Sequence, residues 1–201
     1  MRFLVPAFLA VFAIGCGSSR VYLNRDVATA VVLAPLNESP DTQAGWKMWP
    51  YVEDRVASRG YRIVPHAEVQ KFYEDKKYTG DPGQISEFST EELAKIFNVD
   101  AVVWSKVVSW DKKTLGIYNS IEVKLEAELH DRNREILWKG EGQDGYSSAP
   151  SSKSIFSSFV GTAVADPEKY APGAAMNCFG SLPWAGWDPK APREPAPVPV
   201  K

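Results

Sequence analysis

The feature that most restricts the fold is a stretch of ten residues in which apolar and polar side chains alternate strictly. It runs from Ile121 to His130, with Ile, Val, Leu, Ala and Leu at the odd positions and Glu, Lys, Glu, Glu and His at the even ones. Successive side chains of a β-strand point to opposite faces of the sheet, so this period of two predicts a strand with one buried face and one solvated face. Helical spacing is excluded, because its apolar positions recur every three or four residues.

Other apolar runs predict further strands. Val27–Ala34 is a continuous, largely β-branched run that suits a strand buried on both faces, and Tyr61–Pro65 and Asp100–Trp110 predict two more. We expect a turn at Lys112–Gly116 before the alternating strand, and the inward face resumes at Ile136 after a short turn.

Helices are predicted between these strands. After a polar loop at Asn37–Gly45, apolar residues recur at helical spacing, and Pro50 suits the first turn of this helix. A second helix is expected at His66–Lys77, and Ser89 with Glu92 forms the pattern of a capping box at the start of a third. A strand, a helix and a second strand in this order imply a parallel crossover. The fold class is therefore α/β, with a mixed sheet of about five strands and helices packed on it.

The last fifty residues have a different character. A Ser-rich connector at Ser147–Ser154 precedes a strongly apolar helical stripe, a second helix is expected at about Gly173–Leu182, and the Pro-rich tail 183–201 cannot join a helix or an inner strand. The stripe is either part of the core or a contact face for a partner, and both interpretations stay open. Its candidate partner-binding residues are Ile155, Phe156, Phe159 and Val160.

The N-terminus predicts export and lipidation. Met1 and Arg2 give the chain a positively charged start before the apolar run Phe3–Ile14. As a helix this run would span about 18 Å, which is shorter than the ~30 Å hydrocarbon core of a membrane and is typical of a signal peptide. Its end, Ala13–Cys16, is similar to a bacterial lipobox, in which the Cys16 thiol carries diacylglycerol; an ordinary secretory signal is the alternative. The expected organisation is a cleaved signal peptide at 1–15, the lipidated Cys and a short linker at 16–26, a single domain at 27–182 and the tail.

Charge and ligand content exclude several classes of function. The net charge of −2 provides no clustered cationic surface for nucleic acid, so no nucleic-acid partner is expected. Two His and two Cys, one of them the lipidation candidate, are too few for a tetrahedral zinc site, and no metal site is assigned. Cys178 is interpreted as a buried small hydrophobe, with an intermolecular disulfide as the alternative.

No catalytic residues are assigned. His66 follows a proline at a helix start, His130 lies on the wet face of the alternating strand, and the chain lacks the nucleophile elbow, phosphate-binding loop and zinc-protease motifs. We therefore expect a protein that is not an enzyme.

Several motifs occur in order over roughly residues 10–190: the lipobox at Cys16, Ala30–Pro35, Arg59–Pro65, Phe97–Val103, Glu135–Gly140 and Leu182–Pro183. Together they resemble a bacterial lipoprotein family catalogued as domain of unknown function 799. Where that family has Gly-Ala-Asp-Ala before a strand, this chain has Asn98-Val99-Asp100-Ala101. The resemblance implies an α/β domain similar to the amino-terminal domain of TolB and the company of CsgG-like outer-membrane lipoproteins, and it implies no catalytic residues.

The expected function is a lipoprotein anchored in the outer membrane, on its periplasmic face, that acts as a non-catalytic assembly or scaffold component. Its membrane partner would be lipid, through palmitate-type acyl chains and diacylglycerol on Cys16, with no other cofactor. Gly17, rather than Asp, after the Cys favours the outer membrane. Its protein partner would be an envelope protein such as a CsgG-like lipoprotein, and self-association stays open. The alternatives are an LpoB-like regulator of a cell-wall synthase and a peptidoglycan or small-ligand binder that uses Trp46, Trp49, Trp184 or Trp187.

Overall fold

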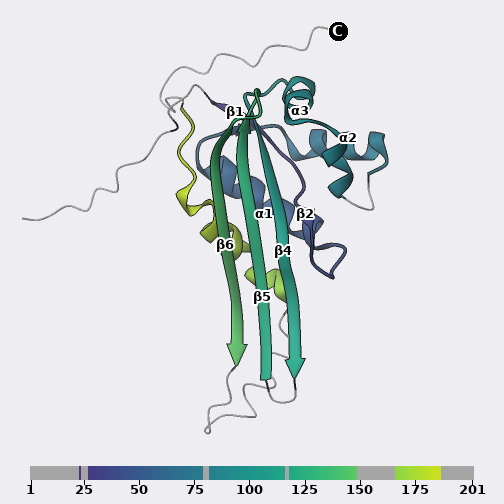
Figure 1. Cartoon of the computed structure of the whole chain (residues 1–201), viewed down its shortest axis with the longest axis vertical. Coiled ribbons are helices and arrows are strands. Elements are labelled where there is room, and N and C mark those ends of the chain that lie inside the picture. The colour runs from purple at the N-terminus through teal and green to yellow at the C-terminus, as the bar shows by residue number, and fades with distance from the viewer. Residues whose placement is uncertain (1–22, 24–26, 79–81, 116–117, 149–165, 187–201) are drawn as a thin grey trace, which may run out of the picture.

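The computed structural model describes residues 23, 27–78, 82–115, 118–148 and 166–186 (Figure 1). Among these residues, no helix has both the length and the apolar character that a bilayer crossing demands. The helices are α1 (Ala44–Ser58), α2 (His66–Lys76), α3 (Thr90–Ile96) and α5 (Ala171–Cys178), with 3-10 turns η1 (Pro82–Glu87), η2 (Pro167–Tyr170) and η3 (Phe179–Ser181). The strands are β1 (Thr29–Val32), β2 (Leu36–Asn37), β3 (Arg62–Ile63), β4 (Ala101–Leu115), β5 (Tyr118–Asp131) and β6 (Ile136–Ser148).

The six described strands form one mixed sheet in the order β3-β1-β4-β5-β6, with β2 also beside β4. β1 is parallel to β3 and β4, whereas β4, β5 and β6 are antiparallel. The predicted α/β class is confirmed, and the sixth strand is the two-residue β2, which pairs Leu36 with Lys106. Residues Ala30–Leu33 are at most 1% exposed, as the apolar run predicted for a strand covered on both faces.

The alternating segment Ile121–His130 makes up most of β5, and the side chains at its odd positions form the floor of the core. Leu129 lies opposite Val103 of β4 and Trp138 of β6, and the three side chains lie in one cross-strand row beneath the helices. The even positions, such as Glu126 and Glu128, lie on the opposite face, which is the face toward the viewer in Figure 1.

Strands β4, β5 and β6 form a long antiparallel ribbon, and they are longer than the sequence predicted. The prediction of a turn at Lys112–Gly116 is wrong, because β4 continues to Leu115 and Lys112 lies opposite Ile121. Residues 116–117 lie outside the described part of the chain. The Ser-rich connector begins later than expected, since β6 extends to Ser148. Polar residues are common in this ribbon because one of its faces is solvated. In the sequence, such polar segments cannot be told from loops.

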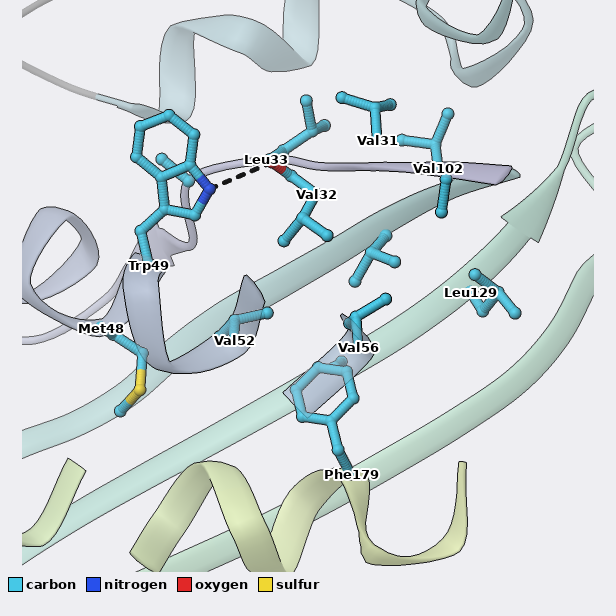
Figure 2. Packing of buried hydrophobic residues seen from close by; sticks show 14 of the residues in the cluster. Val31, Val32, Leu33, Met48, Trp49, Val52, Val56, Val102, Leu129 and Phe179 are labelled. Atoms are coloured by element: carbon cyan, nitrogen blue, oxygen red, sulfur yellow. Dashed lines mark hydrogen bonds between the residues drawn. The ribbon is translucent and has the colours of Figure 1, made fainter. Parts of the chain in front are cut away.

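Helix α1 begins at Ala44, within the predicted loop, so Pro50 lies inside the helix rather than in its first turn. Figure 2 shows the helix packed on β1: the Trp49 indole N–H donates a hydrogen bond of 3.0 Å to the carbonyl of Val32. Met48, Val52 and Val56 of the same face are completely buried. This face fixes α1 against the sheet.

Small residues let α5 approach β6 closely. A Cβ at Gly142 would lie 2.1 Å from the amide nitrogen of Cys178 and 2.5 Å from the carbonyl oxygen of Ala174, so only glycine permits this contact. The predicted helix Gly173–Leu182 is confirmed in outline. It starts at Ala171 and tightens into η3 after Cys178.

The packed domain continues four residues past the predicted boundary at Leu182. The amide of Ala185 donates to the carbonyl of Arg59 at 3.1 Å, and the amide of Gly186 donates to the carbonyl of Val27 at 3.1 Å. Ala185 is 2% exposed. The Pro-rich tail therefore does not begin at 183, and residues 187–201 lie outside the described residues.

Candidate functional site

The residues predicted to carry lipid and partner contacts lie outside the described residues. These are Cys16 and the apolar stripe of Ile155, Phe156, Phe159 and Val160. Lipidation and the role of the stripe therefore stay predictions. The described residues instead define where the chain leaves the domain toward Cys16, and which surfaces lie far from that point.

The exit point toward Cys16 is fixed by Leu23. Its amide donates a hydrogen bond of 2.8 Å to the carbonyl of Trp184, whose ring lies 5.8 Å from the guanidinium carbon of Arg59. Leu23 follows Cys16 by seven residues, so at most about 25 Å of fully extended chain separates the two. We call the end of the domain that carries Leu23, Trp184 and Arg59 the tether end.

At the tether end, Asp100 joins the start of β1 to the start of β4. Its Oδ2 accepts hydrogen bonds from the amides of Ala28 (3.2 Å) and Thr29 (3.0 Å) and from the Thr29 hydroxyl (2.7 Å). Arg132 contacts its other oxygen at 2.5 Å. Burial alone would raise the pKa of Asp100, but the hydrogen bonds from Thr29 and Ala28 and the charge of Arg132 hold it below its ordinary value. The segment leading to the tether is thus coupled to the long ribbon.

The ribbon of β4, β5 and β6 projects away from the tether end. β4 begins beside β1, where Ala101 pairs with Ala30, and it ends at Leu115, beyond the helical layer (Figure 1). At about 3.3 Å per residue, its fifteen residues span about 50 Å. The far end of the ribbon therefore lies about 50 Å from the end that leads to Cys16.

The outer face of the ribbon carries alternating charges that pair across the strands. Lys106 contacts Glu126 at 3.3 Å, and Lys124 contacts Glu141 at 2.6 Å. The Lys139 ammonium, with His130, holds the pKa of Glu128 below its usual range despite partial burial. These exposed pairs contribute little stability, so their arrangement matters mainly for solubility and recognition.

A broad hollow of about 540 Å³ lies on this face, where the charged side chains of these ion pairs flank Trp104 and Leu36. Strand β6 forms the edge of the sheet beside it. Part of this edge is already occupied: the Asn177 side chain donates to the carbonyl of Gln143 at 2.8 Å, and the amide of Gly145 donates to Oδ1 of Asp144 at 2.8 Å. Charged side chains along an edge limit unspecific strand pairing.

The titratable residues singled out from the sequence do not converge. His130 contacts Glu128 at 2.6 Å on the outer face, His66 contacts Glu53 at 2.8 Å beside α1, and Cys178 is the buried last residue of α5. Within the described ranges, no group of three or more His, Cys, Asp or Glu residues could hold a metal ion. Cys178 is buried as predicted, and burial raises its pKa to about 12.

The tryptophans predicted as a binding platform separate into different places. Trp46 and Trp49 line one pocket between α1 and α2, Trp184 lies at the tether end, and Trp187 is outside the described residues. Sequence reasoning missed the other aromatic side of this pocket, formed by His66 and Tyr73 of α2. Their spacing of seven residues, two turns of one helix face, is the signal that could have indicated it.

Comparison with known proteins gives one family. The family model described as "Putative lipoprotein GNA1162-like" matches residues 21–168, more than half of the chain. The protein named "Putative lipoprotein NMB1124/NMB1162" of Neisseria meningitidis serogroup B is 28% identical over 138 residues, 68% of this chain and 64% of that protein. The chain thus spans slightly less than two thirds of this relative's length.

Among the similar solved structures, one carries the name of this family. The crystal structure of lipoprotein GNA1162 from Neisseria meningitidis matches with a TM-score of 0.55 and 28% identity, over 68% of this chain and 95% of that chain. A PelC dodecamer from Paraburkholderia phytofirmans matches with a TM-score of 0.46 and 15% identity, over 79% of this chain and 89% of that chain. The LpoB C-terminal domain from Salmonella enterica matches with a TM-score of 0.42 and 14% identity, over 61% and 87%. These last two TM-scores are too low to support an inference about function or assembly.

Proposed function

Because the chain belongs to the GNA1162-like lipoprotein family, we propose that it is a lipid-anchored scaffold component of the bacterial envelope, oriented by its anchor. The resemblance to a bacterial lipoprotein family is confirmed. In the proposal, acyl chains on Cys16 hold the tether end at the periplasmic face of the outer membrane, and the ribbon points into the periplasm. The chain acts by contact with an envelope protein, and the proposal assigns it no reaction.

One observation carries the orientation: the hydrogen bond between the Leu23 amide and the Trp184 carbonyl. It fixes the chain to one end of the sheet only seven residues after Cys16, so a lipid there would hold this end within about 25 Å of the bilayer. The three ribbon strands start or end at this same end, where Ala101 of β4 lies opposite Asp131 of β5. In the proposal, their other ends therefore point away from the bilayer.

The outer face and the β6 edge are the surfaces that we assign to the protein partner. Both follow the ribbon away from the tether end, and the hollow begins about 10 Å along it, because Trp104 is three residues after Ala101. The exposed Glu141 and Lys139 side chains, 61% and 64% exposed, lie beside the hollow around Trp104. Alternating charges provide selectivity and register more than raw affinity, which suits a scaffold contact with a defined partner.

The experiment is site-specific photo-crosslinking in cells that make the full chain. A photoreactive amino acid replaces Glu141 or Lys139 on the ribbon, or Lys71 on the exposed side of α2 as the control. We expect both ribbon positions to crosslink to the same envelope protein and the control position to give no such product. Crosslinking to that protein from Lys71, or no crosslink from either ribbon position, would overturn the assignment of the ribbon.

The anchor is tested separately with Cys16→Ser. We expect the wild-type chain in the membrane fraction and the variant in the soluble periplasmic fraction. A variant that stays with the membranes after its signal peptide has been removed would contradict the anchor without deciding the role of the ribbon.

A further inference from the structure

A pocket between α1 and α2 lies apart from the ribbon and is built largely from aromatic rings. It has a volume of about 380 Å³, within the range of small-ligand sites. Trp49 and Tyr73, only 2% and 1% exposed, form its floor, and the partly exposed Trp46 and His66 form its walls.

The rings are held in place before any ligand arrives. The Trp49 indole is fixed by its hydrogen bond to Val32, with its ring directed toward the sheet as Figure 2 shows. The centroids of Trp49 and His66 are 4.2 Å apart, and Nδ1 of His66 lies 2.8 Å from Oε2 of Glu53. Trp46 packs on Tyr73 in a T-shaped contact with centroids 5.3 Å apart. Such preorganisation lowers the entropy cost of binding.

The rim is polar but carries no cation. Gln43, Gln70 and Glu74 line it, and none of the eight lining residues, all in the described part of the chain, is Lys or Arg. The Gln70 amide already donates to Glu74 at 3.0 Å, which orients its carbonyl oxygen. An anionic ligand would meet Glu74 without a counter-charge, so phosphates and carboxylates are disfavoured.

Two buried polar atoms of the lining residues, the Trp46 indole N–H and the Tyr73 hydroxyl, have no hydrogen-bond partner among the described residues. A buried donor without an acceptor is costly, and a ligand that supplied an acceptor would recover this cost. The ligand should therefore carry hydroxyl or carbonyl oxygens beside an apolar surface.

We propose that this pocket binds a neutral pyranose ring, such as one unit of a glycan, with its C–H face against the Trp46 indole and its hydroxyls toward Gln43, Gln70 and Glu74. A pyranose combines a flat apolar face with a rim of donors and acceptors, and side-chain amides satisfy both. An organic cation fits less well: Trp46, Trp49 and Tyr73 pack on one another, with centroids 5.3 to 5.9 Å apart, and cannot surround a cation on three sides.

The test uses the purified full-length chain in a polyoxyethylene detergent, which has neither sugar nor ammonium headgroups. Triacetylchitotriose is titrated while tryptophan fluorescence and heat of binding are recorded, with choline chloride and sodium phosphate as comparison ligands. We expect saturable binding of the saccharide alone. Saturation by choline or phosphate without saccharide binding, or no saturation by any ligand, would overturn the proposal.

Neighbouring substitutions on α2 locate the site. Gln70→Ala removes a lining amide from the exposed rim, whereas Lys71→Ala, the matched control, changes an exposed residue that does not line the pocket. We expect a several-fold weaker affinity for Gln70→Ala and no change for Lys71→Ala. Trp46→Ala should weaken affinity by about tenfold or more. Equal affinities of wild type and Gln70→Ala would place saccharide binding elsewhere, even if Trp46→Ala fails to fold.

Discussion

The carboxylate of Asp100 accepts two hydrogen bonds from Thr29, one from its amide at 3.0 Å and one from its hydroxyl at 2.7 Å. In return, the Thr29 hydroxyl oxygen accepts a hydrogen bond of 2.9 Å from the Asp100 amide. This reciprocal contact joins residues 71 positions apart, and it ties the first strand after the tether to the strand that forms the ribbon.

Asp100→Ala should lower the free energy of unfolding by about 1–3 kcal/mol, because it leaves the amides of Ala28 and Thr29 and the Thr29 hydroxyl without their acceptor. Urea unfolding at pH 7 measures the effect. Asp54→Ala, at a side chain that is 64% exposed, is the control and should change stability by less than about 0.5 kcal/mol. Equal effects of the two substitutions would contradict the importance of this contact.

The same carboxylate predicts a pH dependence. Its pKa is lowered in the folded state relative to the ordinary value of 3.8, so its contribution is complete above that value and is lost as the pH falls through the lower folded pKa. Wild-type stability should therefore decrease between about pH 4 and pH 2 more steeply than that of Asp100→Asn, whose side chain does not titrate. Parallel stability curves for the two proteins would show that Asp100 has the same pKa folded and unfolded.

Gly142→Ala tests the close approach of α5 to β6. The new Cβ would lie 2.1 Å from a backbone nitrogen, which cannot move aside as a flexible side chain could, and we expect a loss of about 3 kcal/mol. Gly180→Ala is the matched control, since nothing lies within 4 Å of the position of its added Cβ. Thermal unfolding of both variants decides the matter, and a Gly142→Ala protein as stable as Gly180→Ala would be incompatible with the packing described.

Cys178 should be chemically inert in the folded protein. Its pKa is raised to about 12 by burial, so almost no thiolate is present at pH 8, and the residue is 1% exposed. Maleimide labelling followed by mass spectrometry should show no modification of Cys178 in native protein and complete modification in 6 M guanidinium, a concentration on the order of that which unfolds even very stable domains. Rapid native labelling of Cys178 would mean that α5 detaches from β6.

Ser89→Ala tests the helix start that the sequence indicated. In the structure, the Glu92 amide donates to Ser89 Oγ at 3.3 Å, and the Ser89 amide donates to the Glu92 carboxylate at 2.8 Å. The substitution should cost about 1 kcal/mol of unfolding free energy, whereas Ser89→Asn should retain most of the stability. An unchanged midpoint for Ser89→Ala in chemical denaturation would show that the cap is not used.

Local patterns predicted those elements whose environment is encoded nearby in sequence. The alternation around Leu125, the β-branched run before Pro35 and the capping box at Ser89 each report burial or capping directly, and all three are confirmed. The prediction of a turn at Lys112–Gly116 was wrong because a strand with a solvated face can be as rich in polar residues as a loop. Only its pairing with β5, a tertiary contact, makes it a strand.

The pocket could be predicted only in part, because it arises from two helices that meet through the fold. Trp46 and Trp49 were candidates from the sequence. The seven-residue spacing of His66 and Tyr73 places these two on one helix face, but it does not show which helix that face meets. The same holds for Gly142, whose requirement for glycine comes from α5, more than thirty residues later in the chain. Long-range juxtapositions of this kind carry no periodic signal.

The orientation of the anchored domain is tested most directly by energy transfer to the membrane. Full-length protein is reconstituted in vesicles that contain acceptor lipids, with a donor dye on Lys113→Cys near the ribbon end or on Arg62→Cys beside β1 at the tether end. A donor at position 113 should lie about 40 Å farther from the bilayer than one at position 62, because about twelve strand residues separate their rows. It should therefore show much weaker transfer. Equal transfer from both positions, or stronger transfer from position 113, would contradict a domain held at its tether end with its ribbon directed into the periplasm.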